Sequence, residues 1–171
     1  MRAKHLSSAP FLEHAERLVL AADAYGANVI VNDRVDVALL AGAAGAHVGQ
    51  EDLPPAAARR LLGPGAIIGY STHTAAQIEA AVDEAVTYIA IGPVFGTATK
   101  DTGYEPVGLD RVSEAARIAS DRPVVAIGGI TLETAPQVIA AGASSVAVIG
   151  DLLTNGDPAA RVAAFCRILS L

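Results

Sequence analysis

Six short apolar runs recur along this chain, and each one stops at a glycine or at a polar cluster. The runs are 29–31, 46–48, 66–68, 88–91, 124–127 and 146–149. They are rich in valine and isoleucine without polar alternation, which is typical of strands buried on both faces of a parallel sheet covered by helices. Because the carboxyl ends of such strands meet at one edge, residues far apart in the sequence can share one ligand there.

Helical patterns lie between these runs. Apolar residues recur at helical spacing over 11–22, which predicts a first helix. A capping-box pattern at Thr74 and Gln77 predicts a helix over 74–85, and an Asp-Pro step opens one over 157–169. Strands and helices therefore alternate along the chain.

We expect one α/β domain over residues 1–171, because no linker or low-complexity segment divides the chain. Six complete strands predict a shortened TIM-type (β/α)8 barrel, since such a barrel has eight strands and typically about 200 residues or more. The chain passes almost directly from Met1 and Lys4 into a helix, so the missing strands would belong at the amino end. An open doubly wound sheet is the structural alternative.

The composition excludes several classes of function. The net charge is −6 and no run of Lys or Arg is present, whereas general nucleic-acid binding requires clustered cations. No apolar stretch approaches the roughly 20 residues that cross a bilayer, and no apolar signal segment follows Arg2 and Lys4. We therefore expect a cytoplasmic protein without a membrane partner. The single Cys166 lies in a helical tail, where we expect it to pack.

Five sequence motifs are specific enough to indicate a protein family. They are 32–38 (NDRVDVA), 47–54 (HVGQEDLP), 69–74 (GYSTHT), 92–100 (GPVFGTATK) and 126–130 (AIGGI). In this order they resemble the motifs of thiamine phosphate synthases, and the resemblance covers nearly the whole chain. Arg2 and Lys4 resemble the Arg-x-Lys that closes the family's second strand, which implies that the first strand, the first helix and a glutamine shortly before the arginine are missing.

The resemblance implies a thiamine phosphate synthase barrel and a transferase activity. Such an enzyme couples hydroxymethylpyrimidine diphosphate to thiazole phosphate and releases diphosphate, a step of thiamine biosynthesis. The carbon–oxygen bond of the pyrimidine substrate breaks largely before the thiazole nitrogen attacks. The resemblance therefore implies that the enzyme accelerates the reaction mainly by stabilising the departing diphosphate. It also implies that no covalent enzyme intermediate forms.

Two aspartates are the candidate metal ligands. A diphosphate leaving group carries several negative charges, and Mg²⁺, which prefers oxygen ligands, would assist its departure. Asp33 and Asp52 each come just after a predicted strand, so one strand–helix–strand step would bring them onto neighbouring loops. The resemblance assigns both carboxylates to Mg²⁺, although an isolated loop aspartate more often caps a helix or faces solvent. Glu51 and Asp36 are interpreted as surface charges.

The resemblance also implies residues around the two substrates. The residues expected to neutralise and orient the diphosphate are Lys100, Arg2, Lys4 and Asn32. Those expected near the pyrimidine are Ser71 and His47, and the alternative for His47 is a satisfied buried histidine. Those expected to hold the thiazole phosphate and its loop are Thr97, Thr99, Gly129 and Gly150, the last beside a short helix at 151–153. The predicted catalytic residues are Lys100, Asn32 and Ser71.

Two positions depart from the family pattern. Gly150 stands where a serine is common, so one hydroxyl donor is lost while the backbone donors are kept. Gly96 replaces a frequent proline, which predicts a looser loop.

Two other functions stay open at this point. Thiazole tautomerases of the same superfamily use a histidine at the position of His73 for proton transfer, but that activity gives Asp33, Asp52 and Lys100 no purpose. A truncated, noncatalytic remnant that binds a phosphate ligand would leave a sheet edge open and form a homo-oligomer through it. We favour the synthase, in which the carboxylates of Asp33 and Asp52 and the ammonium group of Lys100 lie together at one end of the barrel.

Overall fold

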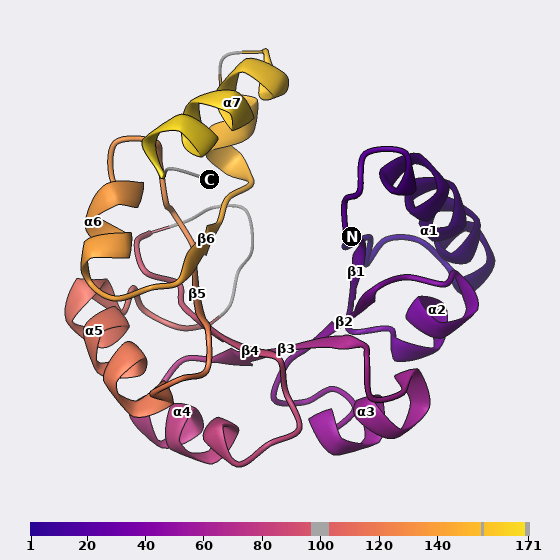
Figure 1. The fold of residues 1–171 in the computed structure, drawn as a ribbon, viewed down its shortest axis with the longest axis horizontal. Helices are drawn as coiled ribbons and strands as arrows, with labels where there is room; N and C mark the ends of the chain where they lie inside the picture. Colours follow the sequence, from indigo (N-terminus) through magenta and orange to yellow (C-terminus); the bar gives the residue numbers. More distant parts are fainter. Residues whose placement is uncertain (97–102, 155, 170–171) are drawn as a thin grey trace. The chain divides into compact units, whose positions relative to one another are not determined.

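The computed structural model describes residues 1–96, 103–154 and 156–169, in which helices and parallel strands alternate (Figure 1). The elements, in chain order, are α1 (Ser8–Asp23), β1 (Ile30–Asn32), α2 (Val35–Leu40), β2 (Gly45–Val48), α3 (Pro55–Leu62), β3 (Ile67–Thr72), α4 (Ala75–Val82), β4 (Tyr88–Ile91), α5 (Gly108–Ala119), β5 (Val124–Ile127), α6 (Ala135–Ala140), β6 (Ser145–Ala147), the 3-10 helix η1 (Gly150–Leu153) and α7 (Pro158–Ile168). The contacts within the chain divide it into two compact units. The first unit comprises Met1–Ser71 and Asp83–Tyr88, and the second comprises Thr72–Val82 and Ile89–Leu171.

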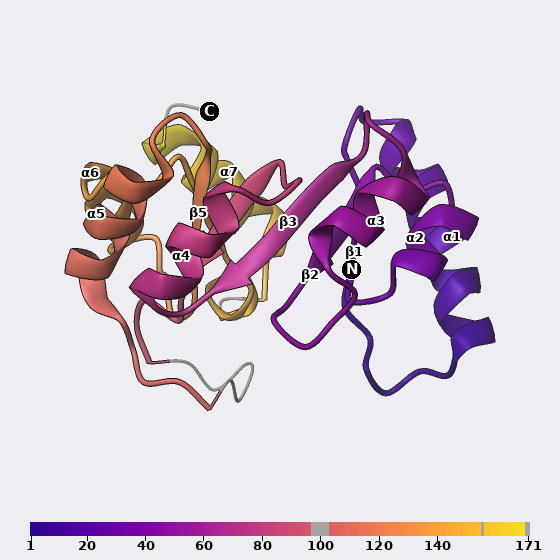
Figure 2. The ribbon, with the colours of Figure 1, turned by 90° about the horizontal axis from the view of Figure 1, so that it is seen from below.

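In the first unit, β1, β2 and β3 pair in parallel and in sequence order. Val31 lies opposite Ala46, which lies opposite Ile68, and all three side chains are fully buried. Figures 1 and 2 show α1, α2 and α3 gathered on one side of these strands. Because side chains alternate between the two faces of a strand, the neighbouring row of residues points to the other face. That row consists of Asn32, His47 and Gly69, which are also paired in register.

In the second unit, β4, β5 and β6 pair in parallel, again in sequence order. Ile89 lies opposite Val124, and both are buried. The helices α4, α5 and α6 lie outside these strands (Figure 1), and each contributes a fully buried aliphatic side chain to the core. These side chains are Ile78, Val112 and Val138. Within neither unit does the strand order reverse, as it would at the switch point of a doubly wound sheet.

Two predicted strand ends differ from the structure by more than one residue. The apolar run at 66–68 predicts a short third strand, but β3 continues to Thr72, so Ser71 lies within the strand and not after it. Backbone pairing with β2 carries the strand onward, with Gly69 opposite His47, because ladder hydrogen bonds do not depend on side-chain polarity. The sixth strand is Ser145–Ala147 and stops before the end of the predicted run at 149.

The helix starts agree with the sequence signals, whereas one helix end does not. Asp157 accepts a hydrogen bond from the backbone N–H of Ala160 at 3.0 Å, which is the expected cap of α7. The helix α4 ends at Val82 and not at the predicted 85. The carbonyl oxygen of Val82 instead accepts a hydrogen bond from the guanidinium of Arg122 at 2.9 Å, which satisfies one of the acceptors that a helix end leaves open.

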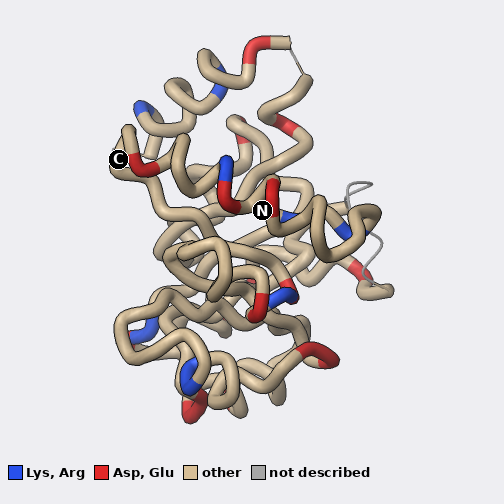
Figure 3. Tube along the Cα trace, turned by 90° about the vertical axis from the view of Figure 1, so that its right-hand side faces the viewer, with Lys and Arg blue, Asp and Glu red and all other residues tan. Residues whose placement is uncertain are grey.

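The charged side chains are dispersed. Figure 3 shows Lys and Arg interspersed with Asp and Glu along the trace, with no long stretch of one sign. Cys166 is half-buried in α7. Among the described residues, no helix has the length and the apolar character that crossing a bilayer would require.

Candidate active site

Asp33 occupies a constrained turn at the end of β1. Its φ is 65°, a conformation that few residues other than glycine adopt, although aspartate tolerates it better than most. The N–H of Arg34 donates to the carbonyl of Asn32 at 2.8 Å, so Asp33 is the central residue of a three-residue turn. Its own N–H donates to the carbonyl of His47 at 2.8 Å, which fixes the turn to β2. Strained backbone of this kind is concentrated at functional sites.

Asp52 lies beside Asp33. The N–H of Gly49 donates to Oδ2 of Asp52 at 2.8 Å and holds that carboxylate in the loop after β2. Burial raises the pKa of Asp52, and the neighbouring carboxylate of Asp33 raises it further, whereas the Gly49 N–H and the charge of Lys4 act in the opposite direction. Two carboxylates in contact repel each other unless a proton or a cation lies between them. This pair therefore has the electrostatic character of a cation site.

Lys4 supplies a positive charge to the same place. Its Nζ lies 2.9 Å from Oδ2 of Asp33, and its side chain is 58% exposed. The segment before it runs along β1, because the N–H of Asn32 donates to the carbonyl of Met1 at 2.9 Å and the Met1 ammonium donates to the carbonyl of Ile30. An exposed ion pair contributes little to stability, so the ammonium group can exchange its carboxylate for a phosphate oxygen at small cost.

His47, whose backbone carbonyl accepts the N–H of Asp33, also joins two other side chains by hydrogen bonds. Nε2 of His47 lies 2.7 Å from Oγ of Ser71, and Nδ1 lies 2.8 Å from the hydroxyl of Tyr88. The side-chain amide of Gln50 donates to the carbonyl of Ser71 at 2.7 Å. Tyr88 and Gln50 were missed by the sequence reasoning. The signal for Tyr88 was present, because an aromatic residue with a polar tip opens an otherwise aliphatic strand and must find a partner when it is buried.

The donor set fits Mg²⁺ better than a metal held by protein ligands alone. Among the described residues, no group of three or more His, Cys, Asp or Glu side chains is placed to hold a metal ion. A structural zinc site would need such a group. Mg²⁺ by contrast is often held by one or two carboxylates and completes its octahedron with water and substrate phosphates. Asp33 and Asp52 form a pair of this kind.

The sequence-predicted residues of the first unit thus come together. Direct contacts join Lys4 to Asp33, Asp33 to Asp52 and to the backbone of His47, and His47 to Ser71. Asn32 precedes Asp33 and lies opposite His47 in the sheet. Arg2 is exposed on the segment that leads to Lys4.

In the second unit, Gly129 lies against the loop that follows β4. The N–H of Val94 donates to the carbonyl of Ile127 at 2.9 Å, and the N–H of Phe95 donates to that of Gly128 at 3.0 Å. Gly129 has φ 64°, and a Cβ there would lie 2.4 Å from the carbonyl oxygen of Gly96. Only glycine fits this position. The loop leads toward predicted residues that lie outside the described part of the chain, namely Thr97, Thr99 and Lys100.

Gly150 is exposed and begins η1, so the short helix expected at 151–153 is present. The neighbouring carboxylate of Asp151 is ion-paired with Arg161 of α7 at 2.9 Å and accepts a hydrogen bond from the N–H of Leu132 at 3.1 Å. Arg161 therefore neutralises the acidic side chain that stands next to the expected phosphate donor.

His73 lies just before α4. Its Nδ1 is 2.5 Å from the carbonyl oxygen of Gly92, and since a carbonyl oxygen only accepts, Nδ1 carries the proton. The imidazole stacks on Tyr104 with 3.8 Å between the ring centroids and 13° between the ring planes. The backbone N–H of His73 donates to Oε1 of Gln77 at 2.8 Å.

Comparisons of the sequence with known proteins all point to the same family. A family model described as thiamine monophosphate synthase matches residues 1–152. The chain is 52% identical over 162 residues to a thiamine biosynthesis bifunctional protein ThiM/ThiE of Symbiobacterium thermophilum, covering 93% of this chain and 33% of that protein. It is 48% identical over 158 residues to a thiamine-phosphate synthase of a Synechococcus strain, covering 92% of this chain and 44% of that protein. The chain thus spans less than half the length of these two relatives.

The comparison of structures agrees. A thiamine phosphate pyrophosphorylase from Pyrococcus furiosus superposes with a TM-score of 0.90 at 30% identity, covering 99% of this chain and 81% of that one. The predicted α/β fold of the TIM type is therefore confirmed, with six strands in the described ranges. The matched motifs and the shared fold together establish that the chain belongs to the thiamine monophosphate synthase family.

Proposed function

We propose that this chain is a thiamine-phosphate synthase. It would couple hydroxymethylpyrimidine diphosphate to thiazole phosphate and release diphosphate, as an enzyme that transfers an alkyl group. The observation that carries the proposal is the contact between the carboxylates of Asp33 and Asp52, with the ammonium group of Lys4 2.9 Å from Asp33. The relatives at 48% and 30% identity are a thiamine-phosphate synthase and a thiamine phosphate pyrophosphorylase, which supports the same reaction.

The first unit provides the groups that a diphosphate ester needs. Asp33 and Asp52 would hold Mg²⁺, which when bound supplies positive charge to the departing diphosphate. Lys4 and Arg2 would add cationic donors to the phosphate oxygens, and the amide of Asn32 would orient them. These contacts strengthen as the bond between the pyrimidine methylene carbon and the diphosphate oxygen breaks. The electron pair leaves with the diphosphate, and the lone pair of the thiazole nitrogen forms the new carbon–nitrogen bond.

Ser71 and His47 would bind the pyrimidine ring. Both are half-buried and hydrogen-bonded to each other, so their polar atoms are held in place before the substrate arrives. Preorganised donors of this kind contribute more to binding than donors that must be ordered.

The second unit would hold the other substrate. We assign the backbone N–H groups of Gly129 and Gly150 to the phosphate of the thiazole, together with Thr97 and Thr99. Lys100 would stabilise the leaving group, and its assignment rests on the family motif. We also retain as predictions a single domain over 1–171, a cytoplasmic location in keeping with the single cysteine, and self-association as a homo-oligomer.

A thiazole tautomerase is the second candidate, and His73 is the residue that favours it. Because Nδ1 donates to the carbonyl of Gly92, the Nε2 atom of a neutral His73 is the basic nitrogen. This activity, however, needs neither of the two paired aspartates. A noncatalytic phosphate-binding remnant is the third candidate, and it would bind phosphate ligands without turning them over.

A coupled assay separates the three candidates. Thiamine phosphate and diphosphate are measured together after mixing the chain with both precursors, with and without Mg²⁺, and in parallel with a version extended upstream. We expect both products in equal amounts and only with Mg²⁺, and we expect Asp33→Ala to abolish them. Asp36→Asn is the matched control, because Asp36 is 58% exposed and pairs with Arg34. Full turnover by Asp33→Ala would overturn the proposal.

A further inference from the structure

We propose that Tyr88 is a positioning residue that fixes the tautomer of His47 and thereby makes the hydroxyl of Ser71 a hydrogen-bond donor to the pyrimidine substrate. The inference rests on the proposed function for the identity of the substrate. If Ser71 donates, the substrate atom that faces its hydroxyl must be a hydrogen-bond acceptor. We assign this acceptor to a ring nitrogen of the pyrimidine.

The imidazole of His47 is held at both nitrogens. Its Nδ1 lies 2.8 Å from the hydroxyl of Tyr88, and its Nε2 lies 2.7 Å from Oγ of Ser71. The ring centroids of His47 and Tyr88 are 5.6 Å apart with 32° between the ring planes, so the phenol approaches the imidazole from its side. All three residues belong to the first unit.

The direction of the hydrogen bonds follows from the phenol. Burial raises the pKa of Tyr88 to about 12, so its hydroxyl keeps its proton at neutral pH. The half-buried hydroxyl of Tyr88 donates that proton to an acceptor within reach, and Nδ1 of His47 is the acceptor in contact with it. In the neutral imidazole the other nitrogen then carries the ring proton, so Nε2–H donates to Oγ of Ser71. The hydroxyl proton of Ser71 is thereby turned away from His47.

Gly69 makes room for this arrangement. It lies opposite His47 in the sheet, and a Cβ at this position would lie 2.2 Å from Cζ and 2.3 Å from the hydroxyl oxygen of Tyr88. The same Cβ would lie 2.4 Å from Nδ1 of His47. The hydrogen bond between Tyr88 and His47 therefore passes directly over a residue without a side chain.

The consequence is a rule for the substrate. A ring nitrogen of an aminopyrimidine accepts a hydrogen bond, whereas a C–H or N–H at the same place would leave the Ser71 proton without an acceptor. Leaving one donor unpaired in a desolvated site weakens binding by about tenfold or more. A pyrimidine analogue with carbon in place of that ring nitrogen should therefore bind at least about tenfold more weakly than the substrate.

The first test uses ¹⁵N NMR of the ligand-free protein at a pH where the imidazoles are neutral. The chain has 4 histidines, and a His47→Gln variant assigns the signals of His47. We expect the Nδ1 signal of His47 to be that of an unprotonated nitrogen and the Nε2 signal to be that of a protonated one. In Tyr88→Phe, which removes only the hydroxyl, both signals should move toward values averaged over the two tautomers. A protonated Nδ1 in the unmodified protein would overturn the inference.

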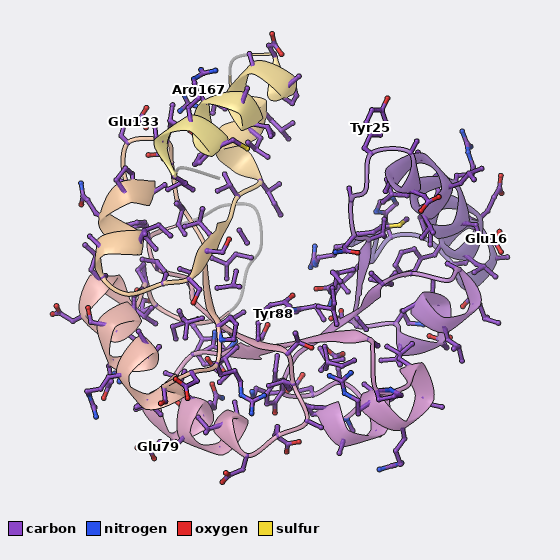
Figure 4. All side chains as sticks on the ribbon, viewed as in Figure 1. Glu16, Tyr25, Glu79, Tyr88, Glu133 and Arg167 are labelled. Atoms are coloured by element: carbon purple, nitrogen blue, oxygen red, sulfur yellow. The ribbon has the colours of Figure 1, made fainter. Side chains whose placement is uncertain are left out.

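The second test is kinetic. Tyr88→Phe should raise the KM for the pyrimidine diphosphate about tenfold, with a smaller change in kcat and no change in the KM for thiazole phosphate. Tyr25→Phe is the matched control, because Tyr25 is 88% exposed (Figure 4) and should leave both values unchanged.

The outcomes distinguish a failure of this inference from a failure of the proposed function. The NMR test needs no substrate, so an unchanged His47 spectrum in Tyr88→Phe would overturn the inference even in an active synthase. A chain with the expected spectrum but no synthase turnover would contradict the proposed function instead, and with it the pyrimidine as the ligand of Ser71.

Discussion

The carboxylate of Asp52 lies beside that of Asp33, although the two residues follow different strands. Each is held by a backbone constraint. Asp33 sits in a turn with positive φ, and Asp52 accepts the N–H of Gly49. The arrangement keeps two like charges together, and the ammonium group that pairs with Asp33 belongs to Lys4, whose side chain is 58% exposed. A site of this kind is more favourable with a bound cation than without one.

Asp52→Asn should remove activity without removing the fold. The amide is of nearly the same shape, and its oxygen can still accept the N–H of Gly49. Loss of one carboxylate from the pair should lower turnover by about 100-fold or more, which is typical for loss of one preorganised electrostatic group. The melting temperature without Mg²⁺ should stay the same or rise, because a repulsive pair is removed. Turnover measurements check the expected loss of activity, and thermal unfolding without Mg²⁺ checks the expected retention of the fold.

Mg²⁺ should raise the melting temperature of the unmodified chain in the presence of a diphosphate ligand, and it should fail to do so in Asp52→Asn. Asp36→Asn should retain the shift. A Mg²⁺-dependent shift of equal size in Asp52→Asn would contradict the assignment of this carboxylate to the metal.

As the pH rises, the contribution of Asp52 to folding stability should change in the opposite direction to that of Asp36. Burial and the carboxylate of Asp33 raise the pKa of Asp52 above 3.8, so in the folded state it keeps a proton that the unfolded state has lost. This contribution to stability is present below the usual aspartate pKa and is lost as the pH rises through the raised pKa. For Asp36 the hydrogen bond from Arg34 lowers the pKa below 3.8, so its contribution is lost as the pH falls.

A ¹³C NMR titration of the carboxyl carbons checks both signs. Addition of Mg²⁺ should lower the pKa of Asp52, because the cation favours the ionised form, and should leave that of Asp36 unchanged. If Asp52 titrates below Asp36 in the absence of Mg²⁺, the like-charge contact is not present in solution.

Gly129→Ala should destabilise the protein more than Gly26→Ala. The two glycines have nearly the same φ, 64° and 63°. A Cβ at Gly26 meets nothing within 4 Å, whereas at Gly129 it lies 2.4 Å from a carbonyl oxygen. Gly26→Ala should therefore cost only the left-handed backbone conformation, about 1–2 kcal/mol. Gly129→Ala should cost a further 1–3 kcal/mol or so from the clash. Urea unfolding measures the difference, and equal costs would show that the loop at 93–96 does not pack against Gly129.

Arg161→Gln should loosen the segment that begins at Gly150. The guanidinium of Arg161 pairs with Asp151, whose side chain is only 8% exposed, so the variant leaves that carboxylate without its cation. We expect a melting temperature lowered by several degrees and a raised KM for thiazole phosphate. Arg167→Gln is the control on the exposed surface of the same helix α7 (Figure 4). Equal effects of the two variants would remove the special role of the ion pair.

The order of the elements could be predicted from the sequence because its signals are local. Runs of valine and isoleucine form strands, and the Asp157 cap opens α7 where the Asp-Pro step predicts it. The end of α4 could not be predicted in this way. At that end the carbonyl of Val82 accepts a hydrogen bond from the guanidinium of Arg122, which lies 40 residues away in the sequence.

Part of the candidate site could also be predicted. Asp33 and Asp52 stand in distinctive motifs at strand ends, and parallel strands that pair in sequence order bring such ends together. Tyr88 was not predicted because it lies outside the five motifs, and Gly69 opens the motif at 69–74 without any role assigned to it. Their role follows only from the approach of a phenol to an imidazole across the strand that carries Gly69.

The sequence by itself determined the alternation of strands and helices, the family and the residue types that can bind a charged phosphate ester, because each depends on short segments and their composition. Only the tertiary structure decided which carboxylates touch, which nitrogen of His47 faces Tyr88, and which glycine could accept no side chain. Those relationships depend on the register between strands. A shift by one residue would move every side chain to the other face of the sheet.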